Sequence, residues 1–251
     1  MKKLFVLCLS LAVVVPMILA DEAELPTAEA LMEQYVEAIG GKENMELIQT
    51  QISKGNFEIP AMGIKASLLI YNAAPGNMLT IAESDAIGKI ESGCVDGIVW
   101  ENSTMMGGRI KEGAEKADAI REAAFDKLTN WKKYYESAVT VGKNSVNGSL
   151  CYQLLLKPKE GTPETYYLNA NTHLLDRIDT DANTPMGTVH VQSFISRYSD
   201  VSNVKMPSEI RVEVMGQERI IKLDSVLCNV KIDPAIFEIP DEIKALIEQD
   251  K

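Results

Sequence analysis

The stretch from residue 139 to residue 181 constrains the fold more than any other part of the chain. Short runs of apolar, strand-forming residues are separated there by Gly, Pro, Asn and Asp, which favour turns. Runs of this length joined by short turns are typical of neighbouring antiparallel strands. The runs are residues 151–156, 165–168 and 174–178. The stretch therefore predicts antiparallel sheet, and it contains no cluster of residues typical of an active centre.

Similar alternation of apolar and polar residues occurs on both sides of this stretch. Before it, we expect strands at residues 51–59, 64–70, 77–84, 87–95 and 98–102; after it, at residues 188–198, 206–215 and 219–230. The whole chain is therefore predicted to contain about ten or eleven strands, with consecutive strands as neighbours in the sheet.

Two segments have helical rather than strand periodicity. Pro26 and Thr27 favour a helix start, and apolar residues then recur at helical spacing until the glycines at residues 40–41. Between residues 113 and 128, one face is formed by Ala117, Ile120, Ala124, Phe125 and Leu128. The charged side chains of this second helix, including Arg121 and Glu122, are predicted to point elsewhere. Short helices are also expected at residues 43–47 and 241–249.

Helices and strands are segregated along the chain, which predicts an α+β fold. A sheet of so many twisted strands must curl, split or close. We expect a strongly curved, largely antiparallel sheet, a half-open β-barrel, with the helices on its concave side. Because no Pro/Gly/Ser-rich linker divides the chain, residues 21–251 are predicted to form one domain.

The first 20 residues have the pattern of a secretory signal peptide. Lys2 and Lys3 precede an uncharged apolar segment that ends at Ala20, and acidic residues follow. The apolar segment is short and contains Pro16, which favours cleavage over retention as a membrane anchor. We therefore expect export and a periplasmic location.

The net charge of the chain argues against one class of partner. Removal of residues 1–20 takes away two lysines and no acidic residue, so the formal net charge changes from −11 to −13. A body this acidic repels phosphate backbones, which argues against nucleic acid as a partner.

The three remaining cysteines, Cys94, Cys151 and Cys228, allow one disulfide at most, and their spacing does not decide whether a Cys94–Cys151 bridge forms.

No motif predicts catalysis or a cofactor. His173 and His190 have no second histidine at ligand spacing, and no G-x-S-x-G sequence is present. Residues 179–183 match the first positions of a calcium loop, but Thr184 stands where that loop needs glycine. We therefore expect no metal, no cofactor and no enzymatic activity.

Several short motifs follow one another along nearly the whole chain after residue 20. They are Ala38-Ile39-Gly40-Gly41, Asp96-Gly97-Ile98-Val99-Trp100, Val146-Asn147-Gly148, Cys151-Tyr152, Tyr166-Tyr167-Leu168, Thr172-His173-Leu174-Leu175, Lys205-Met206-Pro207 and Phe237-Glu238-Ile239-Pro240. Their order resembles the exported proteins grouped as outer-membrane lipoprotein-sorting-like, which are similar to the LolA/LolB lipoprotein carriers. The resemblance implies an unclosed β-barrel whose helices line or cap an apolar cavity for acyl chains.

The resulting hypothesis is a non-enzymatic, monomeric carrier or binder of lipid or lipoprotein acyl chains, with envelope membrane proteins as further partners. Shelter of hydrocarbon from water provides the binding free energy. The predicted lining residues are Leu68, Ile70, Leu79, Ile81, Trp100, Ile120, Leu154, Leu156 and Tyr166. A shift of one residue in strand register would exchange the two faces of the sheet.

A loop formed by Met105, Met106, Gly107 and Gly108 is predicted to act as a gate or a partner contact. Methionine side chains in or beside the strands suit a surface that adapts to varied ligands. One alternative is an envelope stress sensor or protein-interaction module on the same scaffold, without lipid cargo. A second alternative is a hydrolase with an unrecognised site.

Overall fold

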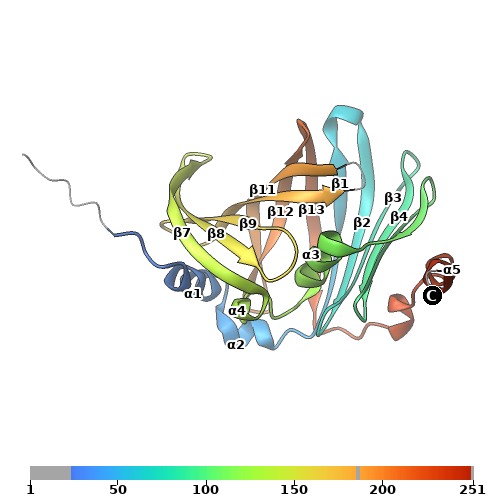
Figure 1. The fold of residues 1–251 in the computed structure, drawn as a ribbon, viewed down its shortest axis with the longest axis horizontal. Helices are drawn as coiled ribbons and strands as arrows, with labels where there is room; N and C mark the ends of the chain where they lie inside the picture. The colour runs from blue at the N-terminus through green and yellow to red at the C-terminus, as the bar shows by residue number, and fades with distance from the viewer. Residues whose placement is uncertain (1–23, 185–186, 250–251) are drawn as a thin grey trace, which may run out of the picture.

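The computed structural model describes residues 24–184 and 187–249, so the predicted signal peptide at residues 1–20 lies outside the described residues. The described chain forms one 13-stranded antiparallel sheet with a few helices (Figure 1). The strands are β1 (Thr50–Ile59), β2 (Ile64–Ala73), β3 (Asn77–Ser84), β4 (Gly88–Val95), β5 (Ile98–Ser103), β6 (Gly107–Ile110), β7 (Tyr135–Val146), β8 (Ser149–Pro158), β9 (Glu164–Asn169), β10 (Leu175–Thr184), β11 (Gly187–Val201), β12 (Val204–Val214) and β13 (Gln217–Cys228). The helices are α1 (Ala28–Ala38), α2 (Gly41–Glu46), α3 (Gly113–Ala123), α4 (Trp131–Tyr134) and α5 (Asp241–Gln249), with 3₁₀ turns η1 (Pro60–Met62) and η2 (Pro234–Phe237).

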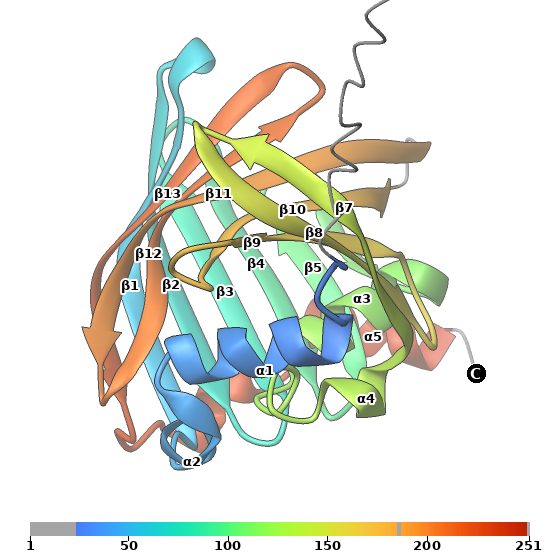
Figure 2. The same cartoon turned by 90° about the vertical axis from the view of Figure 1, so that its left-hand side faces the viewer.

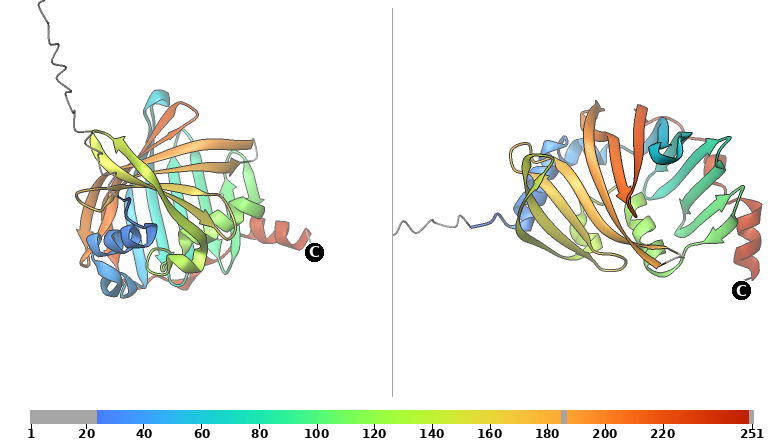
Figure 3. Two further views of the ribbon diagram at one scale, coloured as in Figure 1. Left: turned by 60° about the vertical axis from the view of Figure 1, so that its left-hand side comes forward. Right: turned by 90° about the horizontal axis from the view of Figure 1, so that it is seen from above.

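The order of strands in the sheet is β6-β5-β4-β3-β2-β1-β13-β12-β11-β10-β9-β8-β7. Two meanders, β1–β6 and β7–β13, are therefore joined where the first strand pairs with the last, and β6 and β7 are the edges. Figure 3 shows the sheet from above as a curved, unclosed wall. The predicted α+β half-open barrel is confirmed, with thirteen strands instead of ten or eleven.

β-Bulges help the sheet to bend. The register between β1 and β13 shifts between Lys54 and Gly55, and an added Cβ at Gly55 would lie 1.9 Å from the carbonyl oxygen of Lys222. Only glycine permits so close an approach of two strands. Further register shifts occur in the pairings of β7 with β8, β9 with β10 and β11 with β12.

Helix α1 packs onto the concave side of the β7–β10 half of the sheet (Figure 2). The hydroxyl of Thr27 accepts a hydrogen bond of 3.2 Å from the backbone N–H of Ala30, which caps the helix. The helix buries Leu31, Met32, Tyr35 and Ile39 in the largest core cluster. From the sheet, that cluster includes Tyr135, Leu154, Leu156, Tyr166, Leu168 and Leu175.

Helix α3 lies inside the curve and contacts β4 and β5 from one half of the sheet and β10 from the other. Its buried Ala123 packs against Cys94 and Val99. The helix ends at Ala123 and not at Leu128 as expected. Residues after it turn away, because the backbone N–H of Phe125 donates to the carbonyl of Pro75 (3.2 Å) instead of continuing the helix.

Helix α5 lies on the outer, convex face, so the expectation that helices occupy only the concave side is wrong for this helix (Figure 1). Ile243 is completely buried against Leu79 and Trp100. Gly108 in β6 allows this contact, since an added Cβ there would lie 2.7 Å from Cδ1 of Ile243. The outer cluster also includes Tyr71, Ile81, Ile98, Ile110, Ile236, Phe237, Ile239, Leu246 and Ile247.

All three cysteines of the described chain are free, so the Cys94–Cys151 bridge that the sequence left open is not formed. Cys94 lies under α3 in one half of the sheet, whereas Cys151 packs with Tyr167 and Phe194 in the other. Within residues 24–184 and 187–249, no helix is long and apolar enough to cross a membrane.

Candidate functional site

An apolar pocket of about 270 Å³ lies on the concave side of the sheet. Helices α1 and α2 form one wall, β1, β12 and β13 form the floor, and residues 122–125 with Leu128 form the opposite wall. Its apolar lining includes Tyr35, Ile39, Met45, Ile48, Phe125, Leu128, Met206, Pro207, Leu223 and Val226. The volume lies just below the range of about 300–1,000 Å³ that is typical of small-molecule sites.

The alternation of β13 places side chains on both faces of the sheet. Val226 lines the pocket, whereas the next residue, Leu227, points to the other face and is 51% exposed. On α1, Tyr35 and Ile39 are four residues apart and so share the face that looks toward the pocket. Both elements therefore contribute apolar surface to the same space.

The segment between α3 and α4, residues 124–130, separates this pocket from two others. A groove of about 540 Å³ lies between α1 and α4, and a pocket of about 240 Å³ lies beside α2. Leu128 lines both the apolar pocket and the groove, and Phe125 lines both the apolar pocket and the smaller pocket. Displacement of residues 124–130 would therefore join the apolar pocket to its two neighbours.

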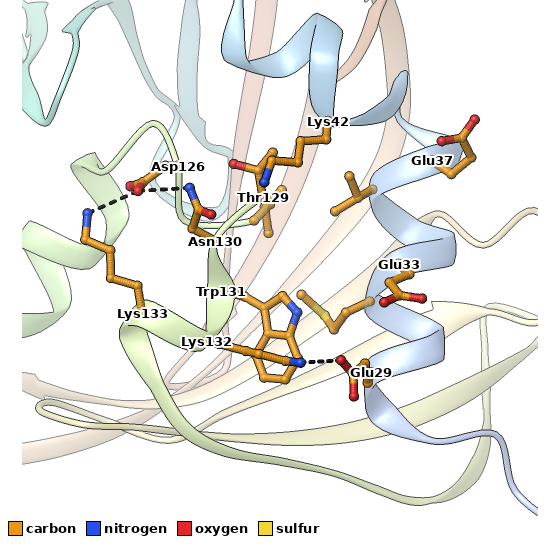
Figure 4. A pocket seen from close by; sticks show the side chains of 13 residues that line it. Glu29, Glu33, Glu37, Lys42, Asp126, Thr129, Asn130, Trp131, Lys132 and Lys133 are labelled. Carbon is orange, nitrogen blue, oxygen red and sulfur yellow. Dashed lines mark hydrogen bonds and ion pairs between the residues drawn. The ribbon is translucent and has the colours of Figure 1, made fainter.

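Figure 4 shows the groove between α1 and α4. Glu29, Glu33 and Glu37 follow one another along α1 at helical spacing, and Trp131, Lys132 and Lys133 come from α4. Lys132 forms an ion pair with Glu29. The Asp126 carboxylate accepts hydrogen bonds from Tyr134, Lys133 (3.1 Å) and Asn130 (3.3 Å), which fixes the end of the 124–130 segment.

A buried ion pair connects α3 to the other half of the sheet. Arg121, 5% exposed, donates to the carboxylate of Glu164 on β9 through Nη2 (2.7 Å) and Nε (3.1 Å). Arg121 also donates to Asp118 (2.9 Å) and to the carbonyl of Glu160 (3.0 Å). Tyr135 at the start of β7 donates to Glu164 (2.8 Å). The network holds α3 across the opening between the two sheet edges.

Burial alone would raise the pKa of Glu164, but the charges of Lys127 and Arg121, with hydrogen bonds from Arg121 and Tyr135, outweigh it and lower that pKa. The side chain of Lys127 is 13% exposed and its ammonium lies 2.5 Å from the carboxylate of Glu122. Burial opposes the charged form of Lys127, but Glu122 and Glu164 raise its pKa above the ordinary value. Both cations are therefore charged at neutral pH.

Helical periodicity did not identify these two cations. On a helical wheel, Arg121 lies away from the predicted apolar face. The ion-pair partner that explains its burial, Glu164, lies 43 residues later in the chain. Lys127 follows the end of α3, so no helical pattern applies to it. The available signal was a charged residue next to an apolar one, as in Ile120-Arg121 and Lys127-Leu128, and it does not distinguish a buried cation from a solvated one.

The nine residues predicted to line a cavity fall into four groups, and none of them lines the apolar pocket. Leu68 and Ile70 lie on the concave face of β2, opposite in direction to Tyr71 of the outer cluster. Leu154, Leu156 and Tyr166 also lie on the concave side, but α1 covers them. Ile120 is 37% exposed on α3.

Leu79, Ile81 and Trp100 form the fourth group, and the expectation that they face the concave side is wrong. They contact the C-terminal segment on the convex face. Their strands carry apolar residues on both faces, as Met78 and Val99 on the α3 side show, so alternation alone did not decide which face is concave.

Met105 and Met106 are highly exposed in the turn between β5 and β6, whereas Gly107 and Gly108 belong to β6. None of the four lines the apolar pocket. Their role as a partner contact or gate stays a prediction. Within the described part of the chain, no group of three or more His, Cys, Asp or Glu side chains could hold a metal ion.

The sequence matches no protein-family model and no curated protein. Solved structures with the same arrangement of strands are found. A DUF1329 family protein from Desulfovibrio piger is 17% identical with a TM-score of 0.57, and the match covers 84% of this chain and 97% of that one. A LolA superfamily protein from Nitrosomonas europaea is 11% identical with a TM-score of 0.56, covering 86% and 99%.

A domain from Vibrio parahaemolyticus, provisionally described as an outer membrane lipoprotein-sorting protein, is 11% identical with a TM-score of 0.56 and covers 84% of this chain and 97% of that one. At these identities the likeness concerns the fold. The resemblance that the sequence motifs indicated is thus confirmed as a fold shared with LolA-like and lipoprotein-sorting proteins.

Proposed function

We propose that this protein is an exported, non-enzymatic binder of acyl chains in the periplasm. The observation that supports the proposal is the apolar pocket between α1, α2 and β13, inside a half-open barrel of LolA-like fold. Removal of hydrocarbon from water contributes roughly 0.8 kcal/mol per CH₂, so a single long chain binds usefully without a specific polar contact.

In this proposal the segment 124–130 is the gate. Outward displacement of Phe125 and Leu128 merges the pocket with the adjoining groove and gives a long chain more room than the pocket alone offers. Leu68 and Ile70, on the concave face of β2, extend the apolar wall available to such a chain. The periplasmic location rests on the signal-peptide pattern of residues 1–20.

A protein-interaction module is the second candidate, supported by the exposed methionines of the β5–β6 turn and of two other turns. Met62, Met105, Met106 and Met215 are all at least 60% exposed. In that role envelope proteins would be the partners and the pocket would stay empty.

A pair of neighbouring substitutions separates the two candidates. Val226→Trp fills the pocket, whereas Leu227→Trp adds the same ring to the opposite face of β13. We expect N-phenyl-1-naphthylamine, a neutral apolar dye, to fluoresce with the wild type and with Leu227→Trp but not with Val226→Trp, provided that circular dichroism shows all three folded. Equal fluorescence from both variants, or none from the wild type, would contradict the acyl-chain proposal.

A further inference from the structure

Among the residues that the structure describes, the buried Arg121 and the largely buried Lys127 both act on the buried carboxylate of Glu164. Glu164 is occupied by Arg121, which donates two hydrogen bonds to it, and by the hydroxyl of Tyr135. The ammonium of Lys127 has a different partner, Glu122. Glu164 also favours the charged form of Lys127, but Glu122 is the carboxylate in direct contact with the Lys127 ammonium.

Glu122 is a partner that can leave. Its side chain is 67% exposed, in contrast to the 13% exposure of Lys127, and it lies on the wall of the apolar pocket. Release of Glu122 into water restores the hydration of its carboxylate at little cost, whereas Lys127 loses its contact partner and keeps only the more distant Glu164, which Arg121 already engages. Glu122 thus occupies the position that a ligand carboxylate would take.

Tyr35 adds a second polar group to the pocket wall, and its hydroxyl interacts with that of Tyr198. Tyr35 lines the pocket from α1. The charge of Lys127 lowers the pKa of the Tyr35 hydroxyl, and the charge of Glu122 raises it. Burial raises its pKa to about 12, against the opposing effect of Lys127, so the hydroxyl keeps its proton at neutral pH. A protonated hydroxyl on the pocket wall, and an ammonium that is paired with the pocket-lining Glu122, suit an anion that carries a hydrocarbon tail.

We propose that the ligand of this pocket is a single-chain amphiphile with an anionic head group, such as a fatty-acid carboxylate, and that Lys127 binds the head group in exchange for Glu122. The inference rests on the proposed acyl-chain function and adds the chemistry of the head group. The tail occupies the space between Ile39, Phe125 and Val226, and the head group lies at the part of the wall that Glu122 forms.

The test is displacement of bound N-phenyl-1-naphthylamine from the full mature chain by palmitate, hexadecyl phosphate and hexadecanol, which share a tail and differ in the head group. We expect the better of the two anions to bind about tenfold more tightly than hexadecanol, as for a hydrogen bond between charged groups. The stronger anion identifies the head group as carboxylate or phosphate.

Three variants assign the effect to Lys127. Lys127→Met should abolish the preference for the anion, and Glu122→Gln should strengthen binding of the anion but not of hexadecanol, provided that circular dichroism shows both variants folded. Lys157→Met removes an exposed lysine on β8 and serves as the matched control with unchanged binding. Equal binding of the three amphiphiles would overturn this inference and leave acyl-chain binding intact. The same holds for a preference for the anion that neither Lys127→Met nor Glu122→Gln changes. No displacement by any of them would overturn both.

Discussion

Arg121 on α3 and Glu164 on β9 form a two-point ion pair, with Nη2 and Nε of the guanidinium 2.7 and 3.1 Å from Oε1 of the carboxylate. The two residues come from opposite sides of the opening in the barrel. The pair therefore fixes the position of α3 across the concave face. Because Arg121 and Glu164 are both buried, water does not replace either partner when the other is removed.

Replacement of Arg121 by Met should lower the free energy of unfolding by about 3 kcal/mol, because it leaves the buried carboxylate of Glu164 without its arginine. Urea denaturation measures the change. Arg109→Met is the matched control: Arg109 pairs with Glu101 and Glu115 but is about one third exposed, so its loss should cost about 1 kcal/mol or less. Equal losses in the two variants would argue against a structural role for the buried pair.

Stability should fall as the pH drops below about 4.5, the ordinary range of a glutamate pKa. The pKa of Glu164 is lower in the folded chain than in the unfolded one, so the unfolded state takes up a proton first and is favoured in acid. The contribution of Glu164 is complete above the unfolded pKa and is lost as the pH falls through the folded pKa. Thermal unfolding followed from pH 7 to pH 3 should show a shallower decline for Glu164→Gln than for the wild type. The same slope in both would assign the acid sensitivity to other carboxylates.

Ile243→Ala should destabilise the protein by about 3 kcal/mol, because it leaves a cavity under α5 next to Trp100. Binding of N-phenyl-1-naphthylamine should be unchanged, since this cluster lies on the convex face and the pocket on the concave one. Lys244→Ala, an exposed change on the same helix, should alter stability by less than about 0.5 kcal/mol. Loss of dye binding in folded Ile243→Ala protein would show that the two faces are coupled.

All three thiols of the mature chain should react with iodoacetamide after denaturation without a reducing agent. Burial raises the pKa of Cys94, Cys151 and Cys228, so the native thiols should react slowly. Intact mass measurement should find three added groups after denaturation and fewer before it. A mass that corresponds to one added group would reveal a disulfide that contradicts the structure.

The strand system could be predicted from the sequence because alternation is a local property. Leu68 and Ile70 alternate with polar or outward residues over a whole strand, and β2 was expected at nearly its observed position. Strand β6 was not expected, because it has four residues and two of them are glycines. Its glycines fit a turn equally well until the contact of Gly108 with Ile243 is known.

The site was harder to predict because its contacts are long-range. Helical spacing continued from Ile120 to Leu128, but the bond from Phe125 to Pro75 ended the helix earlier. The choice between concave and convex depended on where α5 packs, and nothing local to Leu79 or Trp100 encodes that. The burial of Arg121 likewise depended on Glu164, a residue in a different strand.

The pairing of β1 with β13 determines when the sheet can be completed. The backbone N–H of Gln49 is bonded to the side chain of Asn229, a residue 180 positions later, so this seam forms only after nearly the whole chain is available. Until then β1 and β12 each present an unpaired edge, which is a template for association with other chains. A chain that ends before residue 217 would keep both edges open, and we expect such fragments to aggregate and not to survive as smaller barrels.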